Sequence, residues 1–274
     1  MHESGLVLGH FNVAAGLWAS LIVTYAAAYA RLKPWEQPFG TGFAAVDADG
    51  LPRAATDAEA ALWWADGNGV PPTAGICPVA LGADGLRRAS PQGNLALALA
   101  FAPERVLQGA RGIASAAERA PFLARIAEGQ AAAAMGADIG DRPVVMLHGR
   151  ADGLIPVNHS SRAYYAVNQS LGRRSGLRYY EVVHGQHFDA YLGLPGFAER
   201  YVPLQPWIGA SLDRIHARLT GGPALPPSQV LRSKPRAAQA AGLEPLAAVH
   251  LGELQEEAGG DRIEFSEHTL YVPD

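Results

Sequence analysis

The stretch PVVMLHGRADG, residues 143–153, decides the fold class predicted for this chain. It begins as a continuous apolar run closed by Gly149, which is typical of a strand buried on both faces of a parallel sheet. A second strand candidate, rich in Tyr and Val, covers residues 177–183, and Asn158 can cap a helix between the two strands. This order of strand, helix and strand predicts an α/β protein.

A carboxylate and an imidazole follow these two strands. Asp152 lies just after the first strand, and His187, in the block GQHF, lies after the second. Neighbouring parallel strands share a crevice at their carboxyl ends, so we expect the two side chains to meet there. An acid followed by a histidine is typical of the α/β-hydrolase fold, in which a carboxylate orients the imidazole that takes a proton from a nucleophile. The predicted catalytic residues are therefore Asp152 and His187.

Each of these residues also has a structural interpretation. Asp152 precedes Gly153 and could simply cap a turn, because Asp-Gly is a common turn pair. His184 competes with His187, but it follows the strand directly, so we expect it to pack or to anchor the loop. His148 is likewise expected to be structural, because its side chain follows a strand end.

His184, His187 and Asp189 have a spacing that permits metal ligation. No further ligand cluster accompanies them in the sequence, so we predict neither a metal nor a cofactor. Asp189 is expected instead to order the histidine loop by accepting hydrogen bonds from backbone N–H groups.

The nucleophile of such a triad is missing from the pattern. The sequence contains no Gly-x-Ser-x-Gly motif, and no serine before Asp152 follows a buried strand, as a nucleophile elbow requires. These serines are Ser4, Ser20, Ser90 and Ser115. We therefore expect an incomplete chain, inactive on its own, whose missing N-terminal part is the partner that supplies the serine.

Composition and charge exclude several other classes of protein. Of the 274 residues, 49% are hydrophobic, which is enough for a sizeable core. The net charge is −4 and the longest basic runs are pairs of arginines, so a nucleic-acid partner is not expected. A single cysteine, Cys77, excludes an internal disulfide framework. Residues 11–30 are uncharged and Ala-rich, but polar side chains interrupt them, so we expect a buried or lid-forming helix and no membrane span.

Three segments are expected along the chain. Residues 1–140 are predicted to form a helical lid, because helical stretches alternate there with Pro- and Gly-rich loops. Residues 141–223 are predicted to form the C-terminal part of an α/β-hydrolase core that carries the acid and the histidine. Residues 224–274 are predicted to be a tail, loosely held over 224–262, where Ala, Pro, Gly and charged residues are abundant. Within the tail, 262–265 and 269–272 alternate in period two and predict a short hairpin.

Local signals add detail to the first segment. Thr56 and Glu59 form a capping box that predicts a short helix, whereas residues 34–55 are expected to be a loop. Further helices are predicted over 12–31, 91–102 and 103–135.

The block HGQHFDAYLGLP, residues 184–195, resembles the C-terminal region of the D-3-hydroxybutyrate oligomer hydrolases, which are serine esterases of poly(3-hydroxybutyrate) breakdown. The similarity extends to residues 200–204, 23–29, 52–56 and 269–274. The resemblance implies a partial α/β-hydrolase fold and a small-molecule substrate, a short 3-hydroxybutyrate oligomer. It also suggests a secreted or periplasmic protein, although no signal peptide is recognisable at the start of this sequence.

By this resemblance the predicted activity is the hydrolysis of carboxylic esters in 3-hydroxybutyrate oligomers. His187 is expected to act as general base and then as general acid, with Asp152 orienting it. Two alternatives remain. The absent serine favours a non-catalytic remnant or binding module, and the acid–histidine pair also fits a serine hydrolase of another ester or peptide, because the pair does not choose the acyl group.

Overall fold

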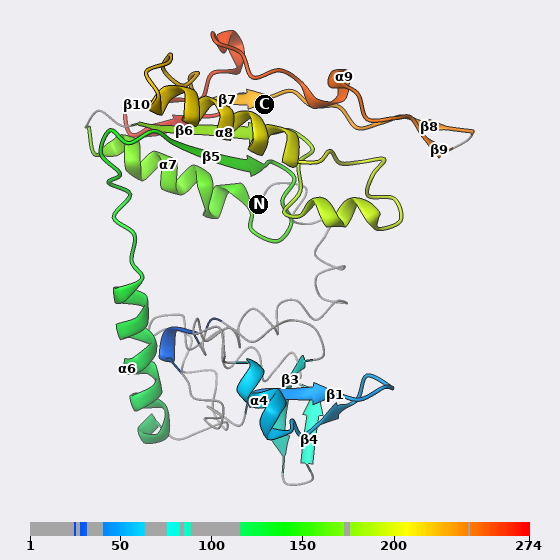
Figure 1. Ribbon diagram of the computed structural model, residues 1–274. Helices are drawn as coiled ribbons and strands as arrows, with labels where there is room; N and C mark the ends of the chain where they lie inside the picture. Colours follow the sequence, from blue (N-terminus) through cyan, green and yellow to red (C-terminus); the bar gives the residue numbers. More distant parts are fainter. Residues whose placement is uncertain are drawn as a thin grey trace. The chain divides into compact units, whose positions relative to one another are not determined.

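The structure is a computed structural model in which residues 25, 28–31, 41–63, 76–82, 85–88, 116–172, 176–240 and 242–274 are described. The chain divides into two compact units between Met135 and Gly136 (Figure 1), close to the predicted boundary at residues 140 and 141. Among the described residues, no helix is both long and apolar enough to cross a membrane. The stretch 11–30 lies mostly outside these residues.

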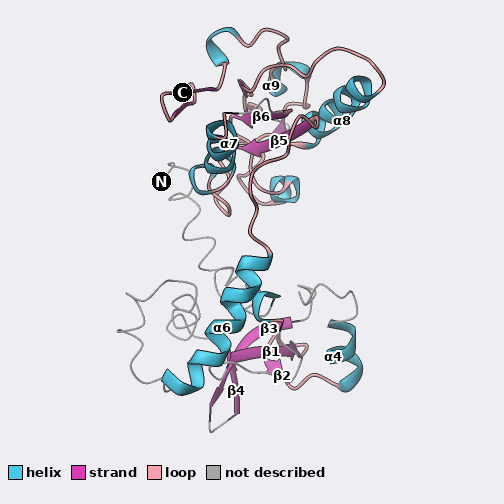
Figure 2. Ribbon diagram, turned by 90° about the vertical axis from the view of Figure 1, so that its left-hand side faces the viewer, coloured by secondary structure: helices cyan, strands magenta, loops and turns pink. Residues whose placement is uncertain are grey.

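The N-terminal unit, which ends at Met135, contains a four-stranded antiparallel sheet in the order β2-β1-β3-β4 (Figure 2). Its strands are β1 (Thr41–Val46), β2 (Pro52–Arg53), β3 (Ile76–Gly82) and β4 (Gly85–Arg88). The prediction of a loop over 34–55 is therefore wrong at β1 and β2, and the segment predicted as a helical lid is not purely helical. Ala and Gly give β1 little strand propensity, so its pairing with β3, remote in sequence, decides its structure.

The same unit contains the helices α4 (Asp57–Trp63) and α6 (Ala116–Ala132). The capping box at the start of α4 is confirmed. The N–H of Glu59 donates to Oγ1 of Thr56 at 3.2 Å, and the N–H of Thr56 donates to the Glu59 carboxylate at 2.9 Å. Helix α6 lies within the helix predicted over 103–135. The predicted helices that fall mostly or wholly outside the described residues are 12–31 and 91–102.

The C-terminal unit, described over residues 136–274 with short gaps, is built on a three-stranded parallel sheet in the order β5-β6-β7. The strands are β5 (Val144–Gly149), β6 (Leu177–Val182) and β7 (Gln229–Leu231). The sheet is flanked by α7 (Ser161–Ser170), which follows β5, and α8 (Gln205–Leu219), which follows β6 (Figure 1). The predicted α/β succession of strand, helix and strand is thus observed in this unit.

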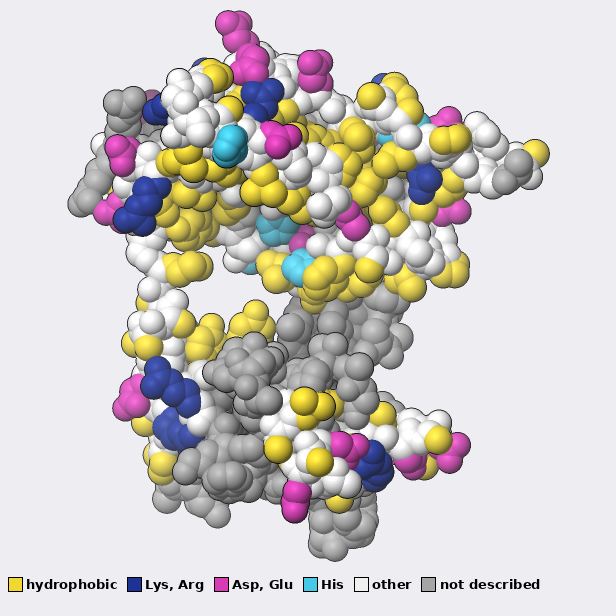
Figure 3. All heavy atoms as spheres, viewed as in Figure 1, with side chains coloured by type: hydrophobic (Ala, Val, Ile, Leu, Met, Phe, Trp, Pro, Cys, Tyr) yellow, Lys and Arg dark blue, Asp and Glu magenta, His cyan; other side chains and the backbone are white. Residues whose placement is uncertain are grey.

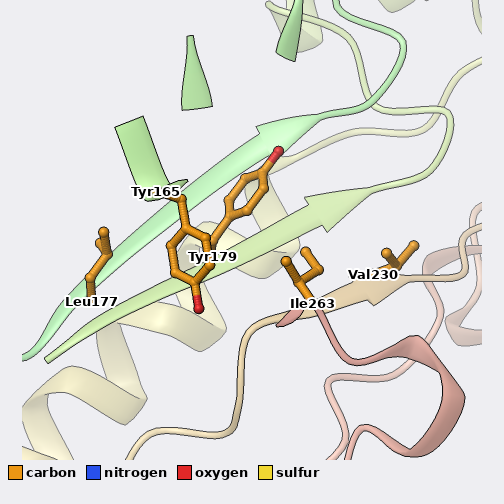
Figure 4. Packing of buried hydrophobic residues seen from close by; sticks show 5 residues of the cluster. All are labelled: Tyr165, Leu177, Tyr179, Val230 and Ile263. Atoms are coloured by element: carbon orange, nitrogen blue, oxygen red, sulfur yellow. The ribbon is translucent and has the colours of Figure 1, made fainter. Parts of the chain in front are cut away.

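Burial on both faces explains why β5 is an apolar run without alternation and why β6 places apolar or aromatic residues on both of its faces. One face carries the cluster of Tyr165, Leu177, Tyr179, Val230 and Ile263 (Figure 4). The other face carries the cluster of Tyr180, Val182, Val202, Trp207 and Leu231. Because Tyr165 belongs to α7 and Trp207 to α8, each helix covers one face of the sheet.

The C-terminal segment 224–274 differs from its prediction in one important respect. The hairpin is confirmed as β10 (Glu264–Ser266) paired with β11 (Thr269–Tyr271). The prediction of a loosely held tail is wrong for β7, which pairs with β6 and buries Leu231 completely. A strand this short shows no periodicity, so only its pairing partner specifies it. The remaining short elements are β8 (Ala238–Gln239), β9 (Gly242–Leu243), α9 (Ala248–Leu251) and η4 (Gly259–Asp261).

Candidate active site

The loops that follow β5 and β6 cross in backbone contact at the carboxyl ends of these strands. The N–H of Arg150 donates to the carbonyl of Val182 at 2.8 Å, and the N–H of Ala151 donates to the carbonyl of Gly185 at 3.0 Å. A Cβ placed on Gly149 would lie 2.3 Å from the carbonyl carbon and oxygen of Gly185. Only glycine fits at Gly149, because any side chain there would push the two loops apart.

We therefore predict that Gly149→Ala lowers the free energy of unfolding by about 3 kcal/mol, at the upper end of the usual cost of overpacking, because backbone atoms must move to admit the methyl group. Urea denaturation of the purified chain measures this change. Gly193→Ala is the matched control, since a Cβ at Gly193 meets nothing within 4 Å, and it is expected to change stability by at most about 0.5 kcal/mol. Equal stabilities of the two variants would contradict the prediction.

Gln186 joins the same two loops through its side chain, which is 2% exposed. Its Nε2 donates to the carbonyl of Ala151 at 2.5 Å, and its Oε1 accepts a hydrogen bond from the N–H of Gly153 at 3.4 Å. The amide thus clamps the loop before the histidine against the loop that carries the acid. The sequence analysis missed this role, because nothing local distinguishes Gln186 from a solvated loop residue.

Asp152 uses both of its carboxylate oxygens. Oδ1 accepts hydrogen bonds from the N–H groups of Leu154 and Ile155 at 2.8 and 2.7 Å, so the turn-capping interpretation is correct for this oxygen. Oδ2 lies 2.8 Å from Nδ1 of His187 and 3.0 Å from Nε2 of His148. Burial alone would raise the pKa of Asp152, but the hydrogen bonds from the two imidazoles and from Ile155 outweigh it and hold the pKa well below its usual range. The carboxylate is therefore ionised at neutral pH.

The expected meeting of Asp152 and His187 is confirmed. Because Oδ2 of Asp152 can only accept, Nδ1 of His187 carries the proton, and the lone pair of the neutral ring is on Nε2. Within the described part of the chain no hydrogen bond occupies Nε2, and the His187 side chain is 23% exposed. Phe188 packs nearly perpendicular to this ring, with the ring centroids 4.2 Å apart. Figure 3 shows histidine side chains beside hydrophobic ones at the surface of this unit. The imidazole is thus oriented to accept a proton at Nε2.

Asp189 and His184 lie with His187 in the histidine loop, which is the loop that follows β6. Asp189, the first residue of η3 (Asp189–Gly193), accepts hydrogen bonds from the N–H groups of Leu204 and Gln205 at 2.7 and 2.9 Å. This confirms its predicted ordering role and connects the loop to the first turn of α8. His184 is half-buried, and burial followed by the charge of Arg150 lowers its pKa. Among the described residues, no group of three His, Cys, Asp or Glu side chains could hold a metal ion.

A buried carboxylate, that of Glu181, lies next to the acid loop, which is the loop that follows β5 and carries Asp152. Glu181 of β6 is fully buried and accepts hydrogen bonds from Arg162 at 2.8 and 2.6 Å, from the Tyr179 hydroxyl at 2.6 Å and from Nε of Arg150. Burial alone would raise the pKa of Glu181, but Arg162, Arg150 and Tyr179 hold it below its usual range. Arg150 also donates to the carbonyl of Pro273 at 2.7 Å. This cluster fixes the backbone just before Asp152, and the sequence analysis did not predict it.

Comparison with known proteins gave the same family from a family model and from individual relatives. The model of the 3HB-oligomer hydrolase (3HBOH) family matches residues 3–274. A D-(-)-3-hydroxybutyrate oligomer hydrolase of Cupriavidus necator is 40% identical over 238 residues, which cover 84% of this chain and 32% of the relative. Proteins of the same name from Burkholderia pseudomallei and Paracidovorax citrulli are 33% and 35% identical and cover 100% and 99% of this chain, against 38% and 39% of their own lengths. The chain thus spans 32–39% of the length of these relatives. No solved structure matches it.

Proposed function

Because this chain belongs to the 3HB-oligomer hydrolase family, we propose that it takes part in hydrolysing the ester bonds of short 3-hydroxybutyrate oligomers. The observation that carries this proposal is the contact of 2.8 Å between Nδ1 of His187 and Oδ2 of Asp152. It leaves Nε2 of a partly exposed imidazole as a base, supported by a buried, ionised carboxylate.

The proposed chemistry is that of a serine esterase whose nucleophile lies outside this chain. Nε2 of His187 takes the proton of the serine hydroxyl as its oxygen attacks the ester carbonyl. The resulting imidazolium, stabilised by Asp152, then gives the proton to the departing alkoxide oxygen of the next 3-hydroxybutyrate unit, which leaves as a hydroxyl group. In the second half, His187 takes a proton from the water that attacks the acyl-enzyme, and it returns this proton to the serine oxygen as the bond between that oxygen and the acyl group breaks and the acid is released.

The arrangement of the C-terminal unit supports a partial α/β-hydrolase fold. The acid follows β5 and the histidine follows the next parallel strand, β6, which is the order of the last two triad members in that fold.

Aromatic side chains near His187 suit an uncharged oligoester. Phe188, 50% exposed, lies against His187 and is followed by Tyr191, with their ring centroids 5.5 Å apart. Phe197 continues this row from Tyr191 at 6.1 Å. Such a surface can bury the methyl groups of 3-hydroxybutyrate units, which offer no charge to recognise before hydrolysis.

The test is a chimaera in which this chain replaces the matching region of the Cupriavidus necator relative. We expect the chimaera to release 3-hydroxybutyrate from the trimer, measured chromatographically, and the purified chain alone to release none above background. A folded chimaera that cleaves activated short-chain esters but not the trimer would contradict the proposed substrate. Hydrolysis by the chain alone that His187→Ala abolishes would contradict an external nucleophile.

A further inference from the structure

His148 lies on the same carboxylate oxygen as His187. Its Nε2 is 3.0 Å from Oδ2 of Asp152 and also 3.0 Å from the carbonyl oxygen of Ile155. Both of these neighbours are hydrogen-bond acceptors, because Asp152 is ionised and a backbone carbonyl has no proton to give. Nε2 of His148 therefore carries a proton and donates it to both, which leaves the lone pair of the neutral ring on Nδ1.

The two histidines consequently use opposite nitrogens toward Asp152. His187 donates through Nδ1, which leaves the lone pair of its neutral ring on Nε2, whereas His148 donates through Nε2, which leaves the lone pair of its neutral ring on Nδ1. With the two backbone N–H groups on Oδ1, the carboxylate receives four hydrogen bonds while only 2% exposed. Four donors fill the acceptor sites of a carboxylate, so each contributes to holding its orientation.

We propose that His148 is a positioning residue that holds Oδ2 of Asp152 at the place where Nδ1 of His187 reaches it. Without the Nε2–H of His148, one lone pair of Oδ2 is left without a donor at a site nearly closed to water. The carboxylate then gains by turning toward solvent, which weakens its bond to His187. The consequence for catalysis rests on the proposed function, but the positioning itself is a property of this chain.

The first test uses the unaltered chain. Long-range ¹⁵N–¹H correlation spectra of the ¹⁵N-labelled protein at neutral pH report which ring nitrogen of each histidine is protonated. We expect the Nε2–H tautomer for His148 and the Nδ1–H tautomer for His187. An Nδ1–H tautomer at His148 would overturn the proposal outright, because Nε2 would then have no proton to donate.

The second test compares two variants by the rate at which the Nδ1–H proton of His187 exchanges with water. His148→Leu removes the donor, and we expect exchange to accelerate by at least about tenfold, as the loss of a hydrogen bond to a charged group implies. His148→Gln places an amide N–H near the position of Nε2 and is expected to stay within about twofold of the unaltered chain. The matched control is His159→Leu, because His159, in η2 (Val157–His159), is exposed and does not contact Asp152. It should leave the rate unchanged.

Two results would overturn the proposal. In the first, the Nδ1–H proton of His187 exchanges in His148→Leu at the same rate as in the unaltered chain. In the second, exchange accelerates equally in His148→Gln and His148→Leu. Circular dichroism checks that each variant is folded. If His148→Leu does not fold, the proposal is tested by the tautomer of His148 in the unaltered chain and by the exchange rate of the His187 proton in His148→Gln. None of these measurements involves ester hydrolysis. A failure of the positioning role is therefore distinguishable from a failure of the proposed function.

Discussion

His187→Ala in the chimaera is expected to lower kcat/KM for the 3-hydroxybutyrate trimer by at least about 10⁴-fold, as the loss of the general base of a catalytic triad does in serine hydrolases. The reason is the position of Nε2, the nitrogen that the contact between Nδ1 and Asp152 leaves available. Alanine provides neither a base for the serine proton nor an acid for the departing alkoxide oxygen. Initial rates over a range of trimer concentrations measure the effect.

The matched control for this substitution is His184→Ala. His184 lies in the same loop, is half-buried, and has no hydrogen bond to Asp152. We expect His184→Ala to retain kcat/KM within about tenfold, the scale of a small displacement rather than of a lost base. If His184→Ala reduced the rate as much as His187→Ala, or if His187→Ala left it unchanged in a folded protein, the assignment of His187 would be wrong.

Glu181→Gln is expected to lower the free energy of unfolding by about 3–5 kcal/mol, because it leaves buried cations without their counter-charge. The side chains of Arg150 and Arg162 are 9% and 20% exposed, and both donate to this carboxylate. The amide has nearly the same shape, so the loss comes from charge and hydrogen bonding and not from a cavity. Urea denaturation of the purified chain at pH 7 measures the difference.

The pH dependence of this difference provides an independent check. Since the pKa of Glu181 is held below its usual range, its ion pairs stabilise the fold above the unfolded pKa, about 4.3. That stability is lost as the pH falls toward the folded pKa, so the gap between Glu181→Gln and the unaltered chain should narrow below about pH 4. The exposed pair of Glu264 and Arg262 supplies the control, since Glu264→Gln should cost at most about 0.5 kcal/mol. Equal costs for the two substitutions would contradict the argument.

Local sequence predicted much of the C-terminal unit. The apolar run of β5 has no alternation because α7 and α8 bury both faces of the sheet, and a run of that kind is recognisable without a structure. Parallel strands bring their carboxyl ends to one edge, so the positions of Asp152 and His187 in the chain already implied that they meet. The ordering role of Asp189 was also predictable, because an aspartate in a loop commonly accepts hydrogen bonds from backbone N–H groups.

Elements whose structure depends on a distant partner were missed. β1 is composed largely of small residues and exists as a strand because it pairs with β3, and β7 exists because it pairs with β6. Composition alone made the region around β7 resemble a loose tail. Neither Ala and Gly nor a strand of three residues carries a periodic signal strong enough to predict pairing.

The candidate site likewise combines residues that the local sequence predicted with residues whose roles only the folded structure revealed. The sequence by itself determined the acid and the histidine, because their residue types and their places after two buried strands are properties of the local chain. Only the tertiary structure decided what holds them: Glu181, a charged residue in a strand, is buried because arginines from the acid loop and from α7 reach it. Likewise His148 became a partner of Asp152 because the turn after β5 folds back over the end of its own strand. Hydrogen bonds between residues brought together by folding have no local pattern, since their geometry depends on the crossing of the two loops at Gly149 and Gly185.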